Sequence, residues 1–257
     1  MSKNDGIGKT LLVAFAICIV CSVVVSTAAV VLKPAQEANK TLDRKRNILA
    51  AAGMLEPGRS VEEQFAQVQT RVIDLKTGEF TDQRNPENYE PVKAAKDPSQ
   101  SIDLSQEEDI AGIGRRENYA LVYLVEGSGG DLDKVILPVR GYGLWSTLYG
   151  FIALESDLNT IAGLGFYEHG ETPGLGGEVD NPRWKALWPG KQVYRDGEVE
   201  IELIKGSVEP DNPRAEWRVD GLSGATLTSR GVTHLVQFWL GEQGYQPFLN
   251  NLKSGEA

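Results

Sequence analysis

The sequence predicts an α+β protein: a single N-terminal transmembrane helix followed by a domain with a mainly antiparallel sheet and flanking helices. Three observations lead to this fold class. Residues 11–32 carry no charge, β-branched and aromatic runs gather after residue 119 without alternating with helical segments, and residues 232–240 have the period of an amphipathic helix.

The apolar run of residues 11–32 is long enough to span a bilayer. It has 22 residues, and a helix needs about 20 to cross a hydrocarbon core of ~30 Å. A cleaved signal peptide is the competing interpretation, because Lys3 and Lys9 precede the run and residues 26–28 resemble a cleavage site. The run is longer than a usual signal segment and continues past that site, which favours an anchor.

Charge leaves the orientation of this helix open. Two lysines precede the run, and five basic residues follow it between residues 33 and 46. Counting alone would keep the following segment in the cytoplasm, but long domains translocate largely regardless of charge. Within the run, Cys18 and Cys21 are interpreted as small apolar residues of the helix, with metal ligation alongside partner helices as the alternative.

Composition excludes several classes of site. The net charge of -10 and the lack of a basic patch with interleaved aromatic residues disfavour nucleic-acid binding. Both cysteines lie in the apolar run, so the polar part has no disulfide framework, thiolate zinc site or iron–sulfur cluster of its own. His169 and His234 are the only histidines, and we expect no metal in the soluble domain.

Residues 33–118 are predicted to form a membrane-proximal helical and irregular region. A helix over residues 35–55 is expected to end at Gly53 and Pro57. A short helix begins at Ser60, with Glu63 placed to complete a capping box. Residues 72–75 indicate a short strand, and the polar, proline-containing residues 81–101 indicate an irregular loop.

Residues 119–257 are predicted to form a domain in which strands dominate. Strands are expected at residues 120–125, 135–139, 151–154, 160–167 and 201–205, the third and fourth forming a hairpin. A C-terminal helix is predicted because apolar residues recur at helical spacing. They are Val232, Leu235, Val236, Trp239 and Leu240.

Three glycine-rich stretches cover residues 141–147, 171–177 and 221–229. None contains a P-loop or a dinucleotide fingerprint, and loop glycines often serve turns alone. The third stretch directly precedes the C-terminal helix, whose free N–H groups and dipole favour a phosphate. Thr226, Thr228 and Ser229 add hydroxyls there and Arg230 adds a cation, although plain N-capping explains the hydroxyls equally well.

Residues 220–226, Asp-Gly-Leu-Ser-Gly-Ala-Thr, resemble the flavinylation motif D-x-x-(S/T)-G-A-(T/S) of bacterial FMN-binding domains. In that family the last Thr or Ser takes FMN through a phosphoester bond, delivered by a flavin transferase. Residues 171–176 resemble the second signature of the family. With the single span and the Gly-Leu-Trp of residues 143–145, the whole chain is similar to the C subunits of sodium-translocating NADH:quinone oxidoreductases.

The resemblance implies that Thr226 carries a covalent FMN and that residues 119–257 form an FMN-binding domain. A threonine hydroxyl is a poor nucleophile, and nothing beside Thr226 looks like a built-in base, which favours attachment by an external enzyme. Thr226 is then an attachment point, and no catalytic residue is expected. Recognition by the flavin transferase is expected at Asp220, Ser223, Gly224, Ala225 and Thr226.

Contacts with the flavin are expected from all three glycine-rich stretches. An apolar wall that includes Trp145 would tune the flavin potential, with core packing as the alternative for this tryptophan. Glu171 would position its loop or raise the cost of a flavin anion. The expected cofactor-binding residues are Leu144, Trp145, Glu171, Thr172, Gly174, Leu175, Gly176, Ser223, Gly224, Ala225 and Leu227.

The resemblance further implies an electron relay that works during NADH oxidation coupled to Na⁺ export. The chain would have no NADH or quinone site of its own. The implied partners are the A, B, D, E and F subunits, the flavin transferase and the lipid bilayer. Residues 1–10 would be cytoplasmic and the large domain periplasmic, at a bacterial inner membrane. Two alternatives are the related G subunit of Rnf ferredoxin:NAD electron-transport complexes and a non-redox anchoring or assembly protein without covalent flavin.

Overall fold

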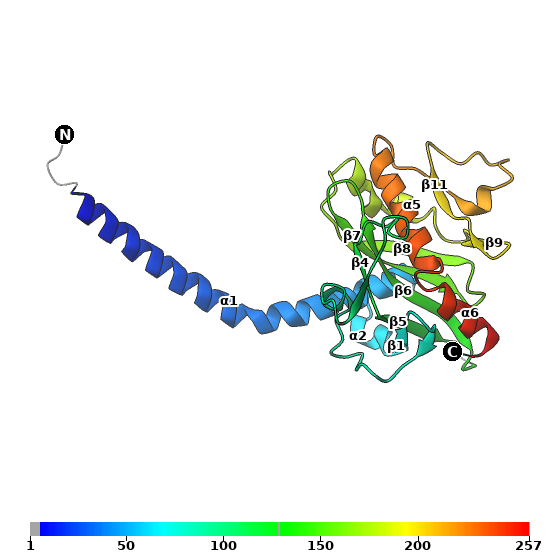
Figure 1. Cartoon of the computed structure of the whole chain (residues 1–257), viewed down its shortest axis with the longest axis horizontal. Coiled ribbons are helices and arrows are strands. Elements are labelled where there is room, and N and C mark those ends of the chain that lie inside the picture. Colours follow the sequence, from blue (N-terminus) through cyan, green and yellow to red (C-terminus); the bar gives the residue numbers. More distant parts are fainter. Residues whose placement is uncertain (1–5, 128, 257) are drawn as a thin grey trace. The chain divides into compact units, whose positions relative to one another are not determined.

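The computed structural model describes residues 6–127 and 129–256, which divide into two units between Arg44 and Lys45. Most of helix α1 (Ile7–Ala51) forms the first unit (Figure 1). In the described part of the chain, α1 is the one helix long and apolar enough to cross a membrane, and its apolar window is not buried within the protein. The predicted extension beyond the span is confirmed, although the helix ends at Ala51 and Gly53 turns the chain with a φ of 67°.

A six-stranded antiparallel sheet lies at the centre of the second unit (Figure 1). Its strand order is β2-β1-β5-β6-β7-β8. The predicted strands at residues 120–125, 135–139, 151–154 and 160–167 are confirmed, and the last two pair as the predicted hairpin. The strands are β1 (Val68–Asp74), β2 (Glu79–Phe80), β5 (Tyr119–Glu126), β6 (Leu132–Tyr142), β7 (Thr147–Glu155) and β8 (Ile161–Glu168).

The boundary predicted between residues 118 and 119 runs through this sheet. Strand β1 pairs with β5 along its whole length, from Val68 opposite Val125 to Asp74 opposite Tyr119. Backbone hydrogen bonds therefore join the two predicted regions into one compact unit that starts at Lys45.

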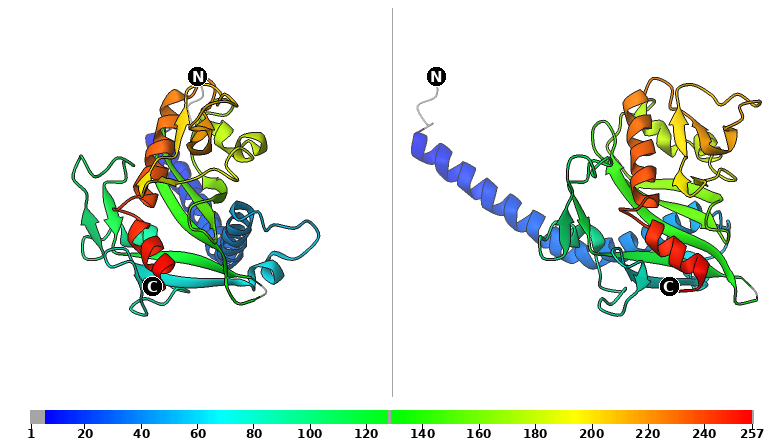
Figure 2. Two further views of the ribbon diagram at one scale, coloured as in Figure 1. Left: turned by 90° about the vertical axis from the view of Figure 1, so that its right-hand side faces the viewer. Right: turned by 45° about the vertical axis from the view of Figure 1, so that its right-hand side comes forward.

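Helix α5 (Thr226–Leu240) covers one face of the sheet (Figure 2). The predicted apolar stripe of this helix is buried, and it packs with alternate residues of β5 and β6 such as Val122 and Leu137. The other face carries Tyr123, whose ring contacts Phe65 of helix α2 (Val61–Phe65) and Phe151. Because both faces are covered, the central strands are buried along most of their length.

The end of α1 from Lys45 onward also belongs to the second unit. Ile48 and Leu49 are fully buried. A Cβ on Gly163 of β8 would collide with the carbonyl oxygen of Ala51, so glycine is needed where the helix end meets the strand. Ser60 caps α2 by accepting a hydrogen bond from the backbone N–H of Glu63, which confirms the predicted helix start.

Short elements connect and flank these layers. The irregular loop predicted at residues 81–101 contains one short helix, α3 (Pro91–Ala94). The strand predicted at residues 201–205 is observed as β11 (Glu202–Ile204), which pairs in parallel with β12 (Arg218–Asp220). The remaining elements are β3 (Ser101–Asp103), β4 (Arg115–Glu117), η1 (Gly176–Asp180), α4 (Pro182–Lys185), β9 (Tyr194–Arg195), β10 (Glu198–Val199), β11 (Glu202–Ile204), η2 (Ala215–Trp217), β12 (Arg218–Asp220) and α6 (Gln246–Ser254).

Candidate functional site

The three glycine-rich stretches meet at one end of the sheet. The first forms the turn between β6 and β7, the second follows β8, and the third leads into α5. A Cβ on Gly231 of α5 would lie 2.5 Å from the carbonyl oxygen of Tyr142, so the helix backbone packs directly on the end of β6. The site is therefore built from segments that are far apart in the sequence.

The carboxylate of Glu171 joins these stretches. Its Oε1 accepts hydrogen bonds from the backbone N–H groups of Leu144 (3.0 Å), Trp145 (2.9 Å) and Ser146 (3.3 Å). Its Oε2 accepts a hydrogen bond from the Thr228 hydroxyl at 2.7 Å. Burial raises the pKa of the Glu171 carboxyl, but these hydrogen bonds outweigh burial and hold the pKa below its ordinary value.

The hydroxyls at the start of α5 differ in accessibility. Thr228 is fully buried and donates to Glu171, while the Oγ of buried Ser229 accepts a hydrogen bond from the backbone N–H of Leu222 at 2.9 Å. Thr226 is exposed at the first position of the helix, and Ser223 is exposed in the preceding turn. Of the three hydroxyls at the start of the helix, Thr226 alone is exposed.

The N-terminus of α5 has no side-chain cap among the described residues, because its N-cap position is Ala225. The first N–H groups of a helix have no partner within the helix, and they carry a partial positive charge. Plain N-capping, the alternative explanation for the hydroxyls, is therefore not what Thr226 and Ser229 do here. The arrangement leaves the helix start able to hold an anion beside Thr226.

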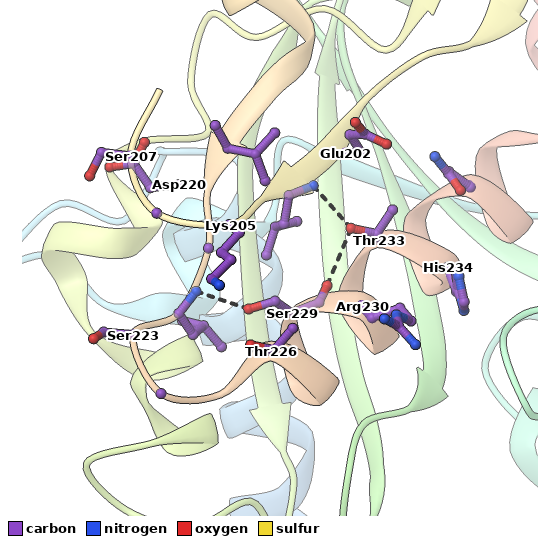
Figure 3. A pocket seen from close by; sticks show the side chains of 17 residues that line it. Glu202, Lys205, Ser207, Asp220, Ser223, Thr226, Ser229, Arg230, Thr233 and His234 are labelled. Atoms are coloured by element: carbon purple, nitrogen blue, oxygen red, sulfur yellow. Dashed lines mark hydrogen bonds between the residues drawn. The ribbon is translucent and has the colours of Figure 1, made fainter. Parts of the chain in front are cut away.

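A hollow of about 700 Å³ opens beside Thr226 (Figure 3). Helix α5 forms one wall with Thr226, Arg230 and His234, and β11 with the turn after it contributes Lys205. Within the described residues, neither Lys205 nor Arg230 forms an ion pair with a carboxylate. Burial, followed by the charge of Arg230, lowers the pKa of His234. Because neither is paired with a carboxylate in the described part of the chain, Lys205 and Arg230 are both available to a negatively charged group.

The motif segment before α5 is held firmly up to Leu222 and then turns outward. The Asp220 carboxylate accepts a hydrogen bond from the backbone N–H of Val208 (2.8 Å), and its carbonyl accepts one from Trp184 Nε1 (3.0 Å). A Cβ on Gly221 would collide with the Ile204 carbonyl oxygen. Gly224 then adopts a φ of 70°, which favours glycine in this turn. The Asp220 side chain is accordingly engaged by the fold.

An apolar surface surrounds the start of α5. Trp145 is 66% exposed, which rules out the core-packing interpretation of this tryptophan. Leu144, Leu175 and Leu227 are also exposed. A Cβ on Gly224 would lie 3.1 Å from Leu175 Cδ2, so Leu175 reaches the turn that precedes Thr226. Exposed apolar side chains on these loops and at the helix start indicate a surface that binds a ligand or a partner.

The other predicted residues of the second stretch form its turn. The carbonyl of Thr172 accepts hydrogen bonds from the backbone N–H groups of Leu175 and Gly177. Thr172 and Gly174 are exposed, and Gly174 has a φ of 76°. Gly176 is buried against the Glu171 side chain.

The two histidines lie in different surroundings. His169 Nε2 lies 2.8 Å from Asp180 Oδ2, and its Nδ1 accepts the backbone N–H of Glu171 at 3.2 Å. His234 lies on the wall of the hollow beside Thr226. Cys18 and Cys21 are exposed on α1. Among the described residues, no three His, Cys, Asp or Glu side chains are grouped so that they could hold a metal ion.

Sequence reasoning missed Lys205 and the structural roles of Thr228 and Ser146. The Oγ of Ser146 accepts a hydrogen bond from the backbone N–H of Gly170 at 2.6 Å, which adds a link between the first stretch and the residue that precedes the second. No local signal marks Thr228 and Ser146, because their partners lie more than 20 positions away in the sequence.

Comparison with known proteins gives consistent matches. Residues 143–241 match the FMN-binding domain family. The chain is 57% identical to the C subunit of the Na(+)-translocating NADH-quinone reductase of Pseudomonas aeruginosa, covering 100% of both chains. The protein of the same name from Yersinia pestis is 49% identical, covering 98% of this chain and 96% of that protein.

Solved structures of proteins of the same family are also similar to this chain. The crystal structure of Shewanella oneidensis NqrC superposes with a TM-score of 0.78 at 40% identity, covering 84% of this chain and 99% of that chain. The C subunit of the Na(+)-translocating NADH-quinone reductase of Parabacteroides distasonis gives a TM-score of 0.66 at 28% identity, covering 85% and 96%.

Proposed function

Because the chain belongs to the family of C subunits of Na(+)-translocating NADH-quinone reductases, we propose that it relays electrons through an FMN attached covalently to Thr226. The single observation that carries this proposal is the exposed Thr226 hydroxyl at the uncapped start of α5, beside the buried and already bonded Thr228 and Ser229. The names of the relatives favour this family over the related Rnf G subunits.

The residues present fit an FMN. Its phosphate would meet the first N–H groups of α5 and the cations Arg230 and Lys205, which face the hollow beside Thr226 (Figure 3). Its ring would be held by the exposed apolar side chains, Leu144, Trp145 and Leu175 among them. The chemistry that FMN supplies is the uptake and return of one or two electrons.

The chain's own residues position and shield the cofactor in this proposal. An apolar wall limits the access of water to the ring, and the fixed charges near the phosphate anchor the other end. Thr226 takes no part in the redox step. No dinucleotide fingerprint occurs in the chain, which fits a relay that receives electrons from another protein of the complex.

Attachment requires a phosphoryl-transfer reaction. The Oγ of Thr226 would form a bond to phosphorus while a phosphoanhydride bond of a flavin dinucleotide donor breaks, and the leaving nucleotide would keep the electron pair of that bond. The hydroxyl proton passes to a base of the flavin transferase, since no described carboxylate or histidine hydrogen-bonds to Thr226. Asp220, Ser223, Gly224 and Ala225 form the proposed recognition segment around the acceptor.

The proposed location is a bacterial inner membrane, with α1 as the anchor and the large domain in the periplasm, where the flavin transferase and the partner subunits would meet it. Trypsin added to spheroplasts tests the orientation, because it digests the domain only if the domain is outside the cytoplasm. A fully protected domain would contradict the proposal.

Thr226→Ala tests the attachment site. The full-length chain is produced together with a flavin transferase and separated by denaturing electrophoresis. The wild-type band should fluoresce under ultraviolet light, and its intact mass should exceed that of the polypeptide by one FMN less one water. Thr226→Ala should abolish both signals because no other exposed hydroxyl has this position.

Two variants control this experiment. Thr226→Ser keeps a hydroxyl at the same position and should keep the flavin, whereas Thr228→Val removes a hydroxyl that already donates to Glu171 and should not remove the flavin. A Thr226→Ala band that still fluoresces would contradict the proposed function.

A further inference from the structure

We propose that Glu171 is the positioning residue of this site: its carboxylate fixes the turn that carries Leu144 and Trp145 against the start of α5, and thereby fixes the wall that faces the flavin. The identity of the cofactor in this proposal rests on the proposed function. The geometry of the contacts and the hydrogen-exchange measurement do not depend on it.

A single carboxylate bridges two elements here. Three successive backbone N–H groups, from Leu144 to Ser146, converge on Oε1 at 2.9 to 3.3 Å. The Thr228 hydroxyl approaches Oε2 at 2.7 Å, and Thr228 lies in the first turn of α5, two residues after Thr226. Glu171 is only 5% exposed. Its hydrogen bonds therefore link two segments of the protein.

Two glycines leave the space that this carboxylate occupies. A Cβ on Gly143 would lie 2.6 Å from Oε1. A Cβ on Gly176 would lie 2.6 Å from both Oε2 and the Thr228 Oγ1. Glycine at both positions is thus a condition for the Glu171 contacts, which gives a physical reason for glycine in two of the three stretches.

Packing does not hold the turn by itself. Trp145, at its tip, is mostly exposed, and Leu144 is more than a third exposed. Within the turn, the Gly143 N–H donates to the Ser146 carbonyl. Hydrogen bonds to other segments include those to the Glu171 carboxylate and the one that the Gly170 N–H donates to the Ser146 hydroxyl oxygen. Removing the carboxylate takes the acceptor from three adjacent N–H groups at once, so the turn should loosen more than its neighbours.

Hydrogen exchange of the full-length chain in detergent tests the contacts directly. In Glu171→Ala, the amides of residues 144–146 should exchange about tenfold faster or more than in the wild type, because three hydrogen bonds lose their common acceptor. Glu171→Gln should recover most of the protection, since its Oε1 can still accept and its amide can donate to the Thr228 hydroxyl. Unchanged exchange in Glu171→Ala would overturn the proposal.

The positioning role needs a second readout on the flavin itself. In Glu171→Ala with FMN attached, the fluorescence anisotropy of the flavin should decay faster and its reduction potential should shift, whereas Glu171→Gln should lie nearer the wild type. Glu168→Gln is the matched control, because it removes an exposed carboxylate three residues away and should change neither readout. Faster exchange with unchanged anisotropy and potential would reduce Glu171 to a purely structural role and also overturn the proposal.

Thr228→Val carries the test if Glu171→Ala does not fold. It removes only the bond at Oε2, so anisotropy and potential should change while the amides of residues 144–146 stay protected. If neither the anisotropy nor the reduction potential of the flavin changes, the proposal is overturned. If wild-type chains carry no flavin, the proposed function fails, and hydrogen exchange still decides whether Glu171 holds the turn.

Discussion

The buried ion pair of Glu117 and Arg140 gives the sharpest test of how the domain is held together. Arg140 Nη1 and Nη2 donate to the two carboxylate oxygens of Glu117 at 2.7 and 2.6 Å. Glu117 is 2% exposed and Arg140 is 8% exposed. The guanidinium also lies 5.1 Å from the ring centre of Trp239, and Trp239 Nε1 donates to the Arg140 carbonyl at 2.7 Å. The pair thus connects β4 and β6 to α5.

Glu117→Ala should lower the free energy of unfolding by about 3 kcal/mol. Removing one partner of a buried ion pair typically costs about 3–5 kcal/mol, because a charge is left buried without compensation. The lower figure applies since Arg140 keeps the Arg115 carbonyl, at 3.2 Å, and the Trp239 ring. For a domain of this size the melting temperature should fall by about 6–12 °C.

Urea unfolding of the second unit, followed by tryptophan fluorescence in the detergent-solubilised chain, measures this change. Glu126→Ala, at an exposed carboxylate on the end of β5, should stay within about 0.5 kcal/mol of the wild type. Combining Glu117→Leu with Arg140→Met should recover most of the loss, because no charge remains buried. A cost below about 1 kcal/mol for Glu117→Ala would refute the reasoning.

Two further predictions concern the site. Leu175→Glu places a negative charge beside Gly224. The flavin should remain attached, but redox titration should show its reduction potential falling by on the order of tens of millivolts. An unchanged potential would remove Leu175 from the contact surface. The folded-state pKa of Glu171 lies below its ordinary value. Its charge therefore stabilises the fold above about pH 4.3, the unfolded pKa, and this contribution is lost as the pH falls through the folded pKa. Urea unfolding should show the stability difference from Glu171→Gln shrinking below about pH 4; a difference independent of pH would contradict this.

Much of the fold follows from local patterns in the sequence. Strands β5 to β8 are long and rich in β-branched and aromatic residues, and α5 has an unbroken apolar stripe, so short windows of sequence suffice. A short window of sequence does not predict helix α6, because this helix is short and polar. It is stabilised by Phe248, whose ring packs against Phe80 from a distant part of the chain. Strand β12 has three residues, and only its parallel pairing with β11 defines it.

The candidate site also has one part that the local sequence predicts and another part that only the folded structure shows. A motif of seven adjacent residues is enough to propose Thr226, because the resemblance to the flavinylation motif lies in one local segment. The Glu171 contacts reach residues 25 to 57 positions away, and which oxygen meets which donor is decided by how β6, β8 and α5 pack. The accessibility of Thr226 against Thr228 also requires the fold, since both are threonines in the same helical turn.

The outward position of Thr226 has a consequence for the order of maturation. Because Thr226 is exposed on a completed helix, the proposed flavin transferase could reach its hydroxyl without unfolding any part of the domain. Folding can thus come first and modification second. In the proposed maturation the flavin would be added to a surface that is already assembled, where the exposed side chains of Leu144, Trp145 and Leu175 would meet it.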